Sequence, residues 1–355
     1  MRQRCLSAII RAVTACICCA SCARAEPVTV FGILDTYLSH VQASGAGSLT
    51  RMDPSGLLAS RIAVRGGDDL GDGYRSSFLL EAGIAGDDGS MADANRLWNR
   101  QAWLALDGPQ GQLRIGRQNT PQFVMNGKFD AFISSTQASG WNNMFGAVPR
   151  VDNAVAYLSP SMAGLTLQAM VARGASGSAL PAAQTAANQS LHLAAEYTHG
   201  RCYLGTNYED LKTTTLPSVA RRVAMGGSCA ASETLTLYAA VAHEMRSDDS
   251  LRTMLYTTSA RYRITAQGAL SLGWTTLHDE LSGAGHGGAH QLGTMYLYAL
   301  SKRTSLYGTL SRLVQQGLRR NFTLQGDTVT APAPPGAELP GAILHGIQLG
   351  MVHTF

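Results

Sequence analysis

The sequence is poor in charged residues. Of its 355 residues only 15% are Asp, Glu, Lys or Arg, against about 25% in an average soluble domain. Hydrophobic residues still make up 45%, and this combination excludes a disordered chain, which needs low hydrophobicity and high charge. Beyond its start, the sequence also lacks any run of the roughly 18 apolar residues that a membrane-spanning helix requires. These absences leave a soluble protein or a membrane protein that crosses with strands.

The first 25 residues have the features of an export signal. A basic start and a mostly apolar stretch are followed by the A-x-A site Ala23-Arg24-Ala25. We therefore expect residues 1–25 to be a cleaved signal peptide and residues 26–355 to form one domain. A lipoprotein signal is the alternative, because Val13-Thr14-Ala15-Cys16 resembles a lipoprotein cleavage box.

Removing the signal changes both the charge and the cysteine count. The segment carries four arginines and no acidic residue, so the formal charge falls from +4 to zero. The hint of an anionic partner disappears with it, and we expect no nucleic-acid partner. The segment also holds five of the seven cysteines, which leaves Cys202 and Cys229.

The remaining sequence alternates between apolar and polar residues with a period of two. In one stretch Phe78, Leu80 and Ala82 share a side, while Ser77 and Glu81 share the other. The residues near the carboxy terminus repeat this pattern. Such alternation predicts β-strands with two unlike faces.

The connections between these strands alternate in length. Seven are short polar turns, and eight are longer stretches rich in Gly, Ser, Ala and Asn. The long stretches cover about 41–56, 85–96, 119–152, 174–190, 210–221, 245–252, 279–290 and 313–343. Fifteen connections imply sixteen strands, most of them close to the ~9–11 residues that a tilted strand needs to cross a bilayer.

An even strand count with tight turns at one end and long loops at the other is typical of an outer-membrane barrel. We therefore predict an all-β fold, a 16-stranded antiparallel transmembrane β-barrel with short periplasmic turns and long extracellular loops. Closure satisfies every strand edge in hydrocarbon, and a barrel of this size has a water-filled lumen. A soluble sandwich or propeller would also alternate, but it would not predict the alternation of short and long connections.

Six blocks of sequence, spread over the mature chain, resemble one known family. They cover residues 60–73, 99–106, 113–118, 150–160, 300–308 and 346–355. Together they are similar to the Gram-negative trimeric general porins of the neisserial type. The resemblance implies a water-filled outer-membrane channel for passive diffusion of small hydrophilic solutes and ions, and a homotrimer surrounded by outer-membrane lipid and lipopolysaccharide. It also implies that Phe355 belongs to a signal for the barrel-assembly machinery.

The resemblance further implies that the third long loop, about 119–152, folds into the barrel and narrows the pore. Arginines on the wall would then face acidic residues on the loop. Carried onto this sequence, the residues of the constriction are Arg61, Glu81, Arg100, Asp130 and Arg150. Because the loop carries few acids, we expect a net positive constriction and a modest preference for anions.

Two other functions fit an exported barrel. One is an adhesin or structural barrel in which the loops act; the other is a lipolytic hydrolase barrel. The hydrolase motif G-x-S-x-G is absent from the sequence, so we expect no enzyme. The glycine motif at 283–288 lies in a loop, where it does not predict a dinucleotide site. His286 and His290 have a metal-binding spacing, but exposed loop histidines are usually solvated, so we expect neither metal nor cofactor.

Cys202 follows one short turn and Cys229 precedes the next. The strands between them run antiparallel, so we expect the two residues to lie opposite each other near the periplasmic rim. An oxidising compartment permits a disulfide, but only some cross-strand positions have the required geometry. The sequence leaves a disulfide and two neighbouring thiols open.

Overall fold

The computed structural model describes most of the chain after the predicted signal peptide. The described residues are 27–146, 148–173, 189–212, 218–281, 287–317, 322–326, 333–337, 339 and 341–355. The predicted signal peptide, the alternative lipoprotein box and His286 lie outside them, as does most of the 283–288 motif.

One antiparallel sheet dominates the described residues. Its first strands are β1 (Thr29–Ala43), β2 (Ser48–Pro54), β3 (Arg61–Gly71), β4 (Tyr74–Gly83), β5 (Gln101–Gly108), β6 (Gly111–Asn119), β7 (Arg150–Leu158) and β8 (Leu165–Arg173). The remaining strands are β9 (Gln189–His199), β10 (Cys202–Lys212), β11 (Ala220–Ala230), β12 (Leu235–Arg246), β13 (Arg252–Arg263), β14 (Gly268–Asp279), β15 (Gly288–Ala299), β16 (Thr304–Gln316) and β17 (Ile343–Thr354). Between β6 and β7 lie the short helices α2 (Pro121–Asn126) and α3 (Gly140–Met144). No helix in the described ranges is long and apolar enough to cross a membrane.

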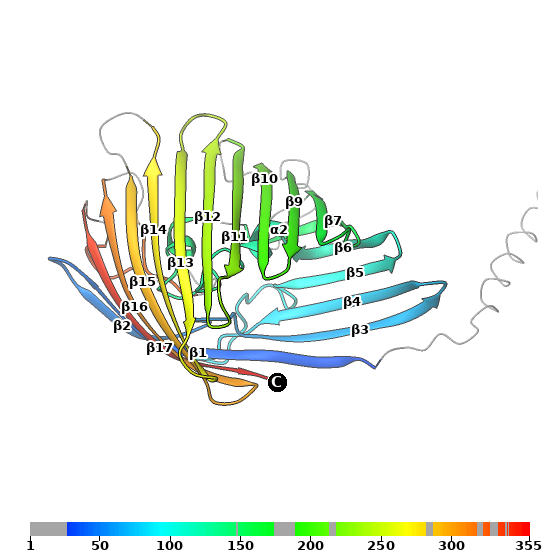
Figure 1. Cartoon of the computed structure of the whole chain (residues 1–355), viewed down its shortest axis with the longest axis horizontal. Helices are drawn as coiled ribbons and strands as arrows, with labels where there is room; N and C mark the ends of the chain where they lie inside the picture. The colour runs from blue at the N-terminus through cyan, green and yellow to red at the C-terminus, as the bar shows by residue number, and fades with distance from the viewer. Residues whose placement is uncertain are drawn as a thin grey trace, which may run out of the picture.

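The sheet closes on itself as a barrel of sixteen wall strands. β2 and β3 both pair with β1, one with its second half and the other with its first, so they are two parts of a single wall strand. β17 pairs with β1 along eleven residue pairs and completes the ring (Figure 1). The backbone N–H of Gly32 donates to Phe355 O at 3.0 Å, and that of Phe355 donates to Gly32 O at 3.1 Å. The predicted strand number and closure are confirmed.

The two faces of the wall differ as the alternation predicts. On β14, Leu270, Leu272 and Trp274 are exposed on the outside, whereas Ser271 and Thr275 are buried on the inside. Apolar side chains exposed outward suit hydrocarbon, where they require no polar partner. The low charge of the sequence therefore follows from the large area of wall that faces lipid.

Two connections differ from the prediction. The first long loop was expected at about 41–56, but β1 continues to Ala43 and β2 begins at Ser48, so only residues 44–47 turn the chain. The connection from β12 to β13 is likewise short, at residues 247–251. In both places the strands continue beyond the apolar band with polar side chains, and a polar strand end resembles a loop in sequence. The real interruption is at residues 55–60, called here the inward break, where the wall strand divides into β2 and β3.

The third loop folds into the barrel and forms a core there. Residues 120–149 lie between β6 and β7, and Figure 1 shows α2 inside the ring of strands. Met125, Phe129 and Trp141 on this loop pack in one apolar cluster with wall residues such as Leu255 and Leu277. The lumen is therefore filled on the side of β9–β15 and stays open toward β3–β7.

Candidate functional site

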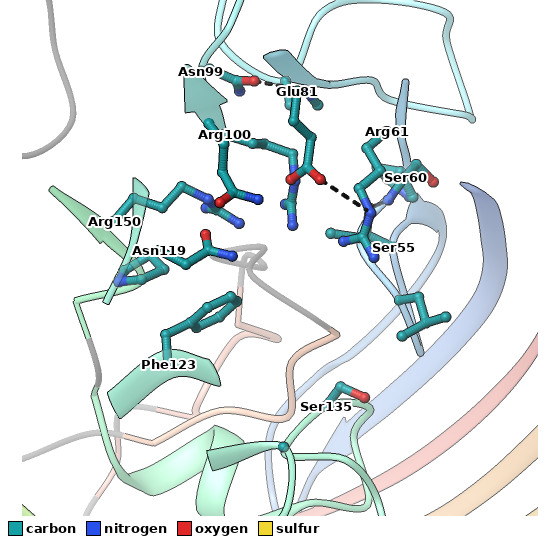
Figure 2. A pocket seen from close by; sticks show the side chains of 18 of the residues that line it. Ser55, Ser60, Arg61, Glu81, Asn99, Arg100, Asn119, Phe123, Ser135 and Arg150 are labelled. Atoms are coloured by element: carbon teal, nitrogen blue, oxygen red, sulfur yellow. Dashed lines mark hydrogen bonds and ion pairs between the residues drawn. The ribbon is translucent and has the colours of Figure 1, made fainter. Parts of the chain in front are cut away.

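A cavity of about 1160 Å³ runs between the third loop and the wall of β3–β7. Three stretches of chain line it: the inward break, the second loop between β4 and β5, and the third loop. Of the five predicted constriction residues, Arg61, Glu81, Arg100 and Arg150 line this cavity together, whereas Asp130 does not (Figure 2).

Glu81 stands between two arginines on the cavity wall. It lies on the inner face of β4, and Arg100 Nε is 2.7 Å from its Oε1. Arg61 Nε, at the start of β3, is 3.8 Å from its Oε2 (Figure 2). Glu81 and Arg100 are both at most 5% exposed, and Arg61 is less buried. The carboxylate therefore compensates Arg100 closely and Arg61 only in part.

Arg150 enters the same cavity from the other side. It is the first residue of β7, and its guanidinium carbon lies 5.2 Å from the ring centroid of Phe123. Phe123 belongs to α2, whose N-cap Thr120 accepts a hydrogen bond from its backbone N–H at 3.3 Å. The capped helix thus presents an aromatic face to the guanidinium, an arrangement that attracts a cation.

Arg117 is a cavity residue that the sequence did not identify as one. Strict alternation along β6 places it on the outer face, beyond Leu113 and Ile115. The register of β6 against β7 shifts between Gly116 and Gln118, and such a bulge redirects a side chain. Gly116 has φ +123°, a left-handed value that favours glycine. Arg117 consequently lines the cavity, and period-two reasoning alone could not have found it.

The cavity lining has more positive than negative charge. Its charged residues are Arg61, Arg100, Arg117, Arg150, Glu81 and Asp93. Four arginines against two carboxylates give a formal excess of two positive charges. Among the described residues no group of three or more His, Cys, Asp or Glu is placed to hold a metal ion.

Asp130 has a different position from the one expected. It is 2% exposed within the third loop, and its carboxylate accepts the backbone N–H groups of Phe132 and Ser134 at 3.0 and 2.6 Å and the hydroxyl of Ser139. Burial raises the pKa of this carboxyl above its usual value, and these hydrogen bonds oppose that shift. Asp130 therefore shapes the loop from within and presents no acidic face to the cavity.

The inward break supports the third loop. The hydroxyl of Ser135 donates to Leu57 O at 2.8 Å, and the backbone N–H of Thr136 donates to Gly56 O at 3.0 Å. The break is itself held by Asp35 on β1. The Asp35 carboxylate accepts from the backbone N–H of residues 56, 57 and 58 at 3.2, 2.8 and 2.7 Å. It also accepts from Tyr307 Oη at 2.6 Å.

Glycines on the inner wall leave room for the opposite side of the same loop. Each of five faces a loop residue that an added methyl group would meet: Gly205, Gly226, Gly273, Gly293 and Gly346. The closest approach is at Gly293 on β15, where a Cβ would lie 2.0 Å from the carbonyl oxygen of Ala138. Backbone cannot give way there as a flexible side chain can.

Replacing Gly293 by alanine should push residues near Ala138 away from β15 and into the cavity. We expect a lower single-channel conductance and a loss of stability of about 1–3 kcal/mol from overpacking. Gly308→Ala is the matched control, since a Cβ there would lie 3.0 Å from the flexible end of Leu349 and 3.8 Å, an ordinary contact distance, from Gln348 O. Equal conductance in both variants would contradict the tight seating of the loop.

The two cysteines of the described residues are joined on the barrel wall. Cys202 and Cys229 are direct partners in the pairing of β10 with β11, and a disulfide links them. Tyr203, the neighbour of Cys202, packs against the core inside the barrel, so alternation places Cys202 on the outer face. The two cysteines therefore lie opposite each other next to the short turns, as predicted.

The closed barrel, its inward loop and its charged cavity define a channel of the bacterial outer membrane. Residues 12–317 match the Gram-negative porin family, and the chain belongs to this family. Outer membrane porin protein 32 of Delftia acidovorans is 28% identical over 351 residues, which cover 92% of this chain and 94% of that protein. Major outer membrane protein P.IB of Neisseria meningitidis is 30% identical over 146 residues, 39% of this chain and 42% of that protein.

Solved structures share the fold at low sequence identity. An anion-selective porin from Comamonas acidovorans has a TM-score of 0.71 and 23% identity, covering 94% of this chain and 100% of that one. OmpT of Vibrio cholerae, in a trimer form, has a TM-score of 0.64 and 12% identity, covering 93% and 99%. The protein is thus an outer-membrane porin, and its family and fold are known as channels rather than enzymes.

Proposed function

We propose that the cavity is the selective part of the pore and that it prefers anions modestly. The observation that carries this proposal is the excess of arginine over carboxylate among the residues lining it, with Arg61, Arg100 and Arg150 around Glu81. In a narrow passage with low-dielectric walls, such an excess raises the local concentration of anions and lowers that of cations.

The arrangement of pairs explains why the preference would be modest. Glu81 compensates Arg100 at 2.7 Å, and Asp152 compensates Arg117 at 2.6 Å. Close pairing of this kind weakens the positive field that the four arginines of the lining produce in the cavity. A solute would cross by diffusion past them, with no step of chemical change. The anion-selective porin of similar fold gives further support.

Reversal potentials test this proposal. The purified protein, reconstituted in a planar bilayer across a tenfold potassium chloride gradient, should give a reversal potential of the sign that chloride permeation produces. The potential should become smaller at high salt, because the Debye length falls to about 3 Å at 1 M and the charges of the arginines are screened beyond it. A potential of the opposite sign would end the proposal, and it would leave the porin fold untouched.

We further propose a homotrimer in outer-membrane lipid, a carboxy-terminal signal at Phe355 for the barrel-assembly machinery, and export by the signal at residues 1–25. A trimer form among the similar structures supports the first part. Phe355 is 44% exposed, which supports the second, because a recognition signal must be accessible. Mass spectrometry of the native protein in detergent would test both the mature N-terminus and the mass of the assembly.

A further inference from the structure

The second loop forms part of the cavity wall. Residues 84–100 connect β4 to β5, and the first half of this loop lines the cavity through Ile84, Ala85, Ser90, Met91, Ala92 and Asp93. This half is fixed to the wall through its backbone. The N–H of Ile84 donates to Ser60 O at 3.1 Å, and the N–H of Ala92 donates to Gly83 O at 3.0 Å.

The second half of the loop is attached to the barrel through side chains. Arg96 Nη1 lies 2.7 Å from Asp152 Oδ1 on β7, so the loop reaches past β5 and β6 to the third strand along. Arg117 Nη1 lies 2.6 Å from the same oxygen, and Arg117 Nε donates to Asn99 O at 2.7 Å. One carboxylate oxygen thus connects the loop to two neighbouring strands.

Arg96 is more buried than the residues next to it in the loop. Ala94, Asn95 and Leu97 are exposed, whereas Arg96 is half-buried with 20% of its side chain accessible. Asp152 and Arg117 have 16% and 12% of their side chains accessible. An ion pair with this degree of burial is screened by salt less than a surface pair, and removing one partner leaves the other charge poorly compensated.

From these contacts we infer that Asp152 sets the bore of the pore by tethering the second loop at the cavity through Arg96. The tether holds the stretch from Asp93, which lines the passage, to Arg96 against the wall. Without it the loop keeps its attachments at residues 84, 92 and 99 and loses that at Arg96, so the stretch between residues 92 and 99 can move outward. Asp152 is a positioning residue in this scheme, and it acts on solute size through Arg96.

Passage of neutral sugars separates this role from a purely electrostatic one. This inference rests on the pore itself, but neutral sugars do not respond to anion preference. In liposome swelling, Arg96→Gln and Asp152→Asn should each speed the entry of di- and trisaccharides by about twofold or more relative to a monosaccharide. Arg96→Gln removes a positive charge and Asp152→Asn a negative one, so a shared effect on sugars cannot come from charge.

Arg252→Gln is the matched control. Arg252 Nη2 pairs with Asp249 Oδ1 at 2.6 Å in the β12–β13 connection, and neither residue lines the cavity. This variant should retain the wild-type ratio of sugar rates. Heat-modifiable mobility in gels should confirm that all three variants fold as barrels.

The outcomes are distinct. Wild-type sugar ratios in both Arg96→Gln and Asp152→Asn would overturn the tether. A shift of ion preference in Asp152→Asn without faster sugar entry would also overturn it and would leave Asp152 with a charge role alone. Wild-type protein that admits no sugar would instead point to a failure of the channel assignment.

Discussion

Replacing Asp35 by alanine is expected to widen the pore and to raise its single-channel conductance by about twofold or more. Asp35 is buried on β1 and receives four hydrogen bonds, three from the backbone of the inward break and one from Tyr307. Alanine would leave three backbone N–H groups without their acceptor, and each of the buried ones costs about 1–3 kcal/mol. The break should therefore lose its inward conformation.

The effect should extend to the third loop because the loop depends on the break. Ser135 and Thr136 bond to carbonyl oxygens of residues 57 and 56, which move once the Asp35 carboxylate is removed. The loop would then be held mainly by its packing against β9–β15. The side facing the arginines would lose its support, and the passage should enlarge there.

Two further variants test whether the effect depends on the hydrogen bonds that Asp35 accepts. Tyr307→Phe removes one of the four hydrogen bonds and should give a small change in conductance. Asp53→Ala is the control. It removes another buried carboxylate of the same wall, which pairs with Arg51 at 2.6 Å and does not bond to the inward break. If Asp35→Ala forms folded barrels with wild-type conductance, the break does not set the position of the loop.

Reversing the charge at Arg61 should abolish the anion preference. Arg61→Glu changes the formal charge of the lining from an excess of two positive charges to zero, because replacing one positive charge by one negative charge lowers the total by two. The double variant Arg61→Glu with Arg100→Glu should prefer cations by about twofold or more. The measurement is the reversal potential in a salt gradient, combined with a check that the barrel is folded.

A charge swap separates net charge from disruption of the site. In Glu81→Arg with Arg100→Glu the pair is preserved in the opposite order, so the net charge of the lining stays the same. This variant should stay close to wild type in ion preference. Arg303→Glu, on the exposed turn between β15 and β16, makes the same change of charge outside the cavity and should have little effect. An unchanged reversal potential in Arg61→Glu would remove this residue from the selective part of the pore.

The sequence predicted the wall better than the interior. Period-two alternation and the spacing of turns gave sixteen strands and closure, because each depends on residues that are neighbours along the chain. Where polar strand ends continued past the apolar band, as in β1 and β2, the same pattern placed a loop too early. The resemblance to porins then located Arg61, Glu81, Arg100 and Arg150, which the structure brings into one cavity.

The sequence by itself determined a barrel with an apolar outside and a polar inside, and the resemblance to the porins added the loop that enters it. Only the tertiary structure decided what that loop and the lumen look like. Asp130 is turned into the loop by hydrogen bonds to its own segment, Arg117 is redirected by a bulge, and Asp35 bonds to Tyr307, 272 positions away. Asp35 and Tyr307 meet only when the ring closes, and the loop and the bulge depart from period-two alternation, so that pattern carries none of these contacts.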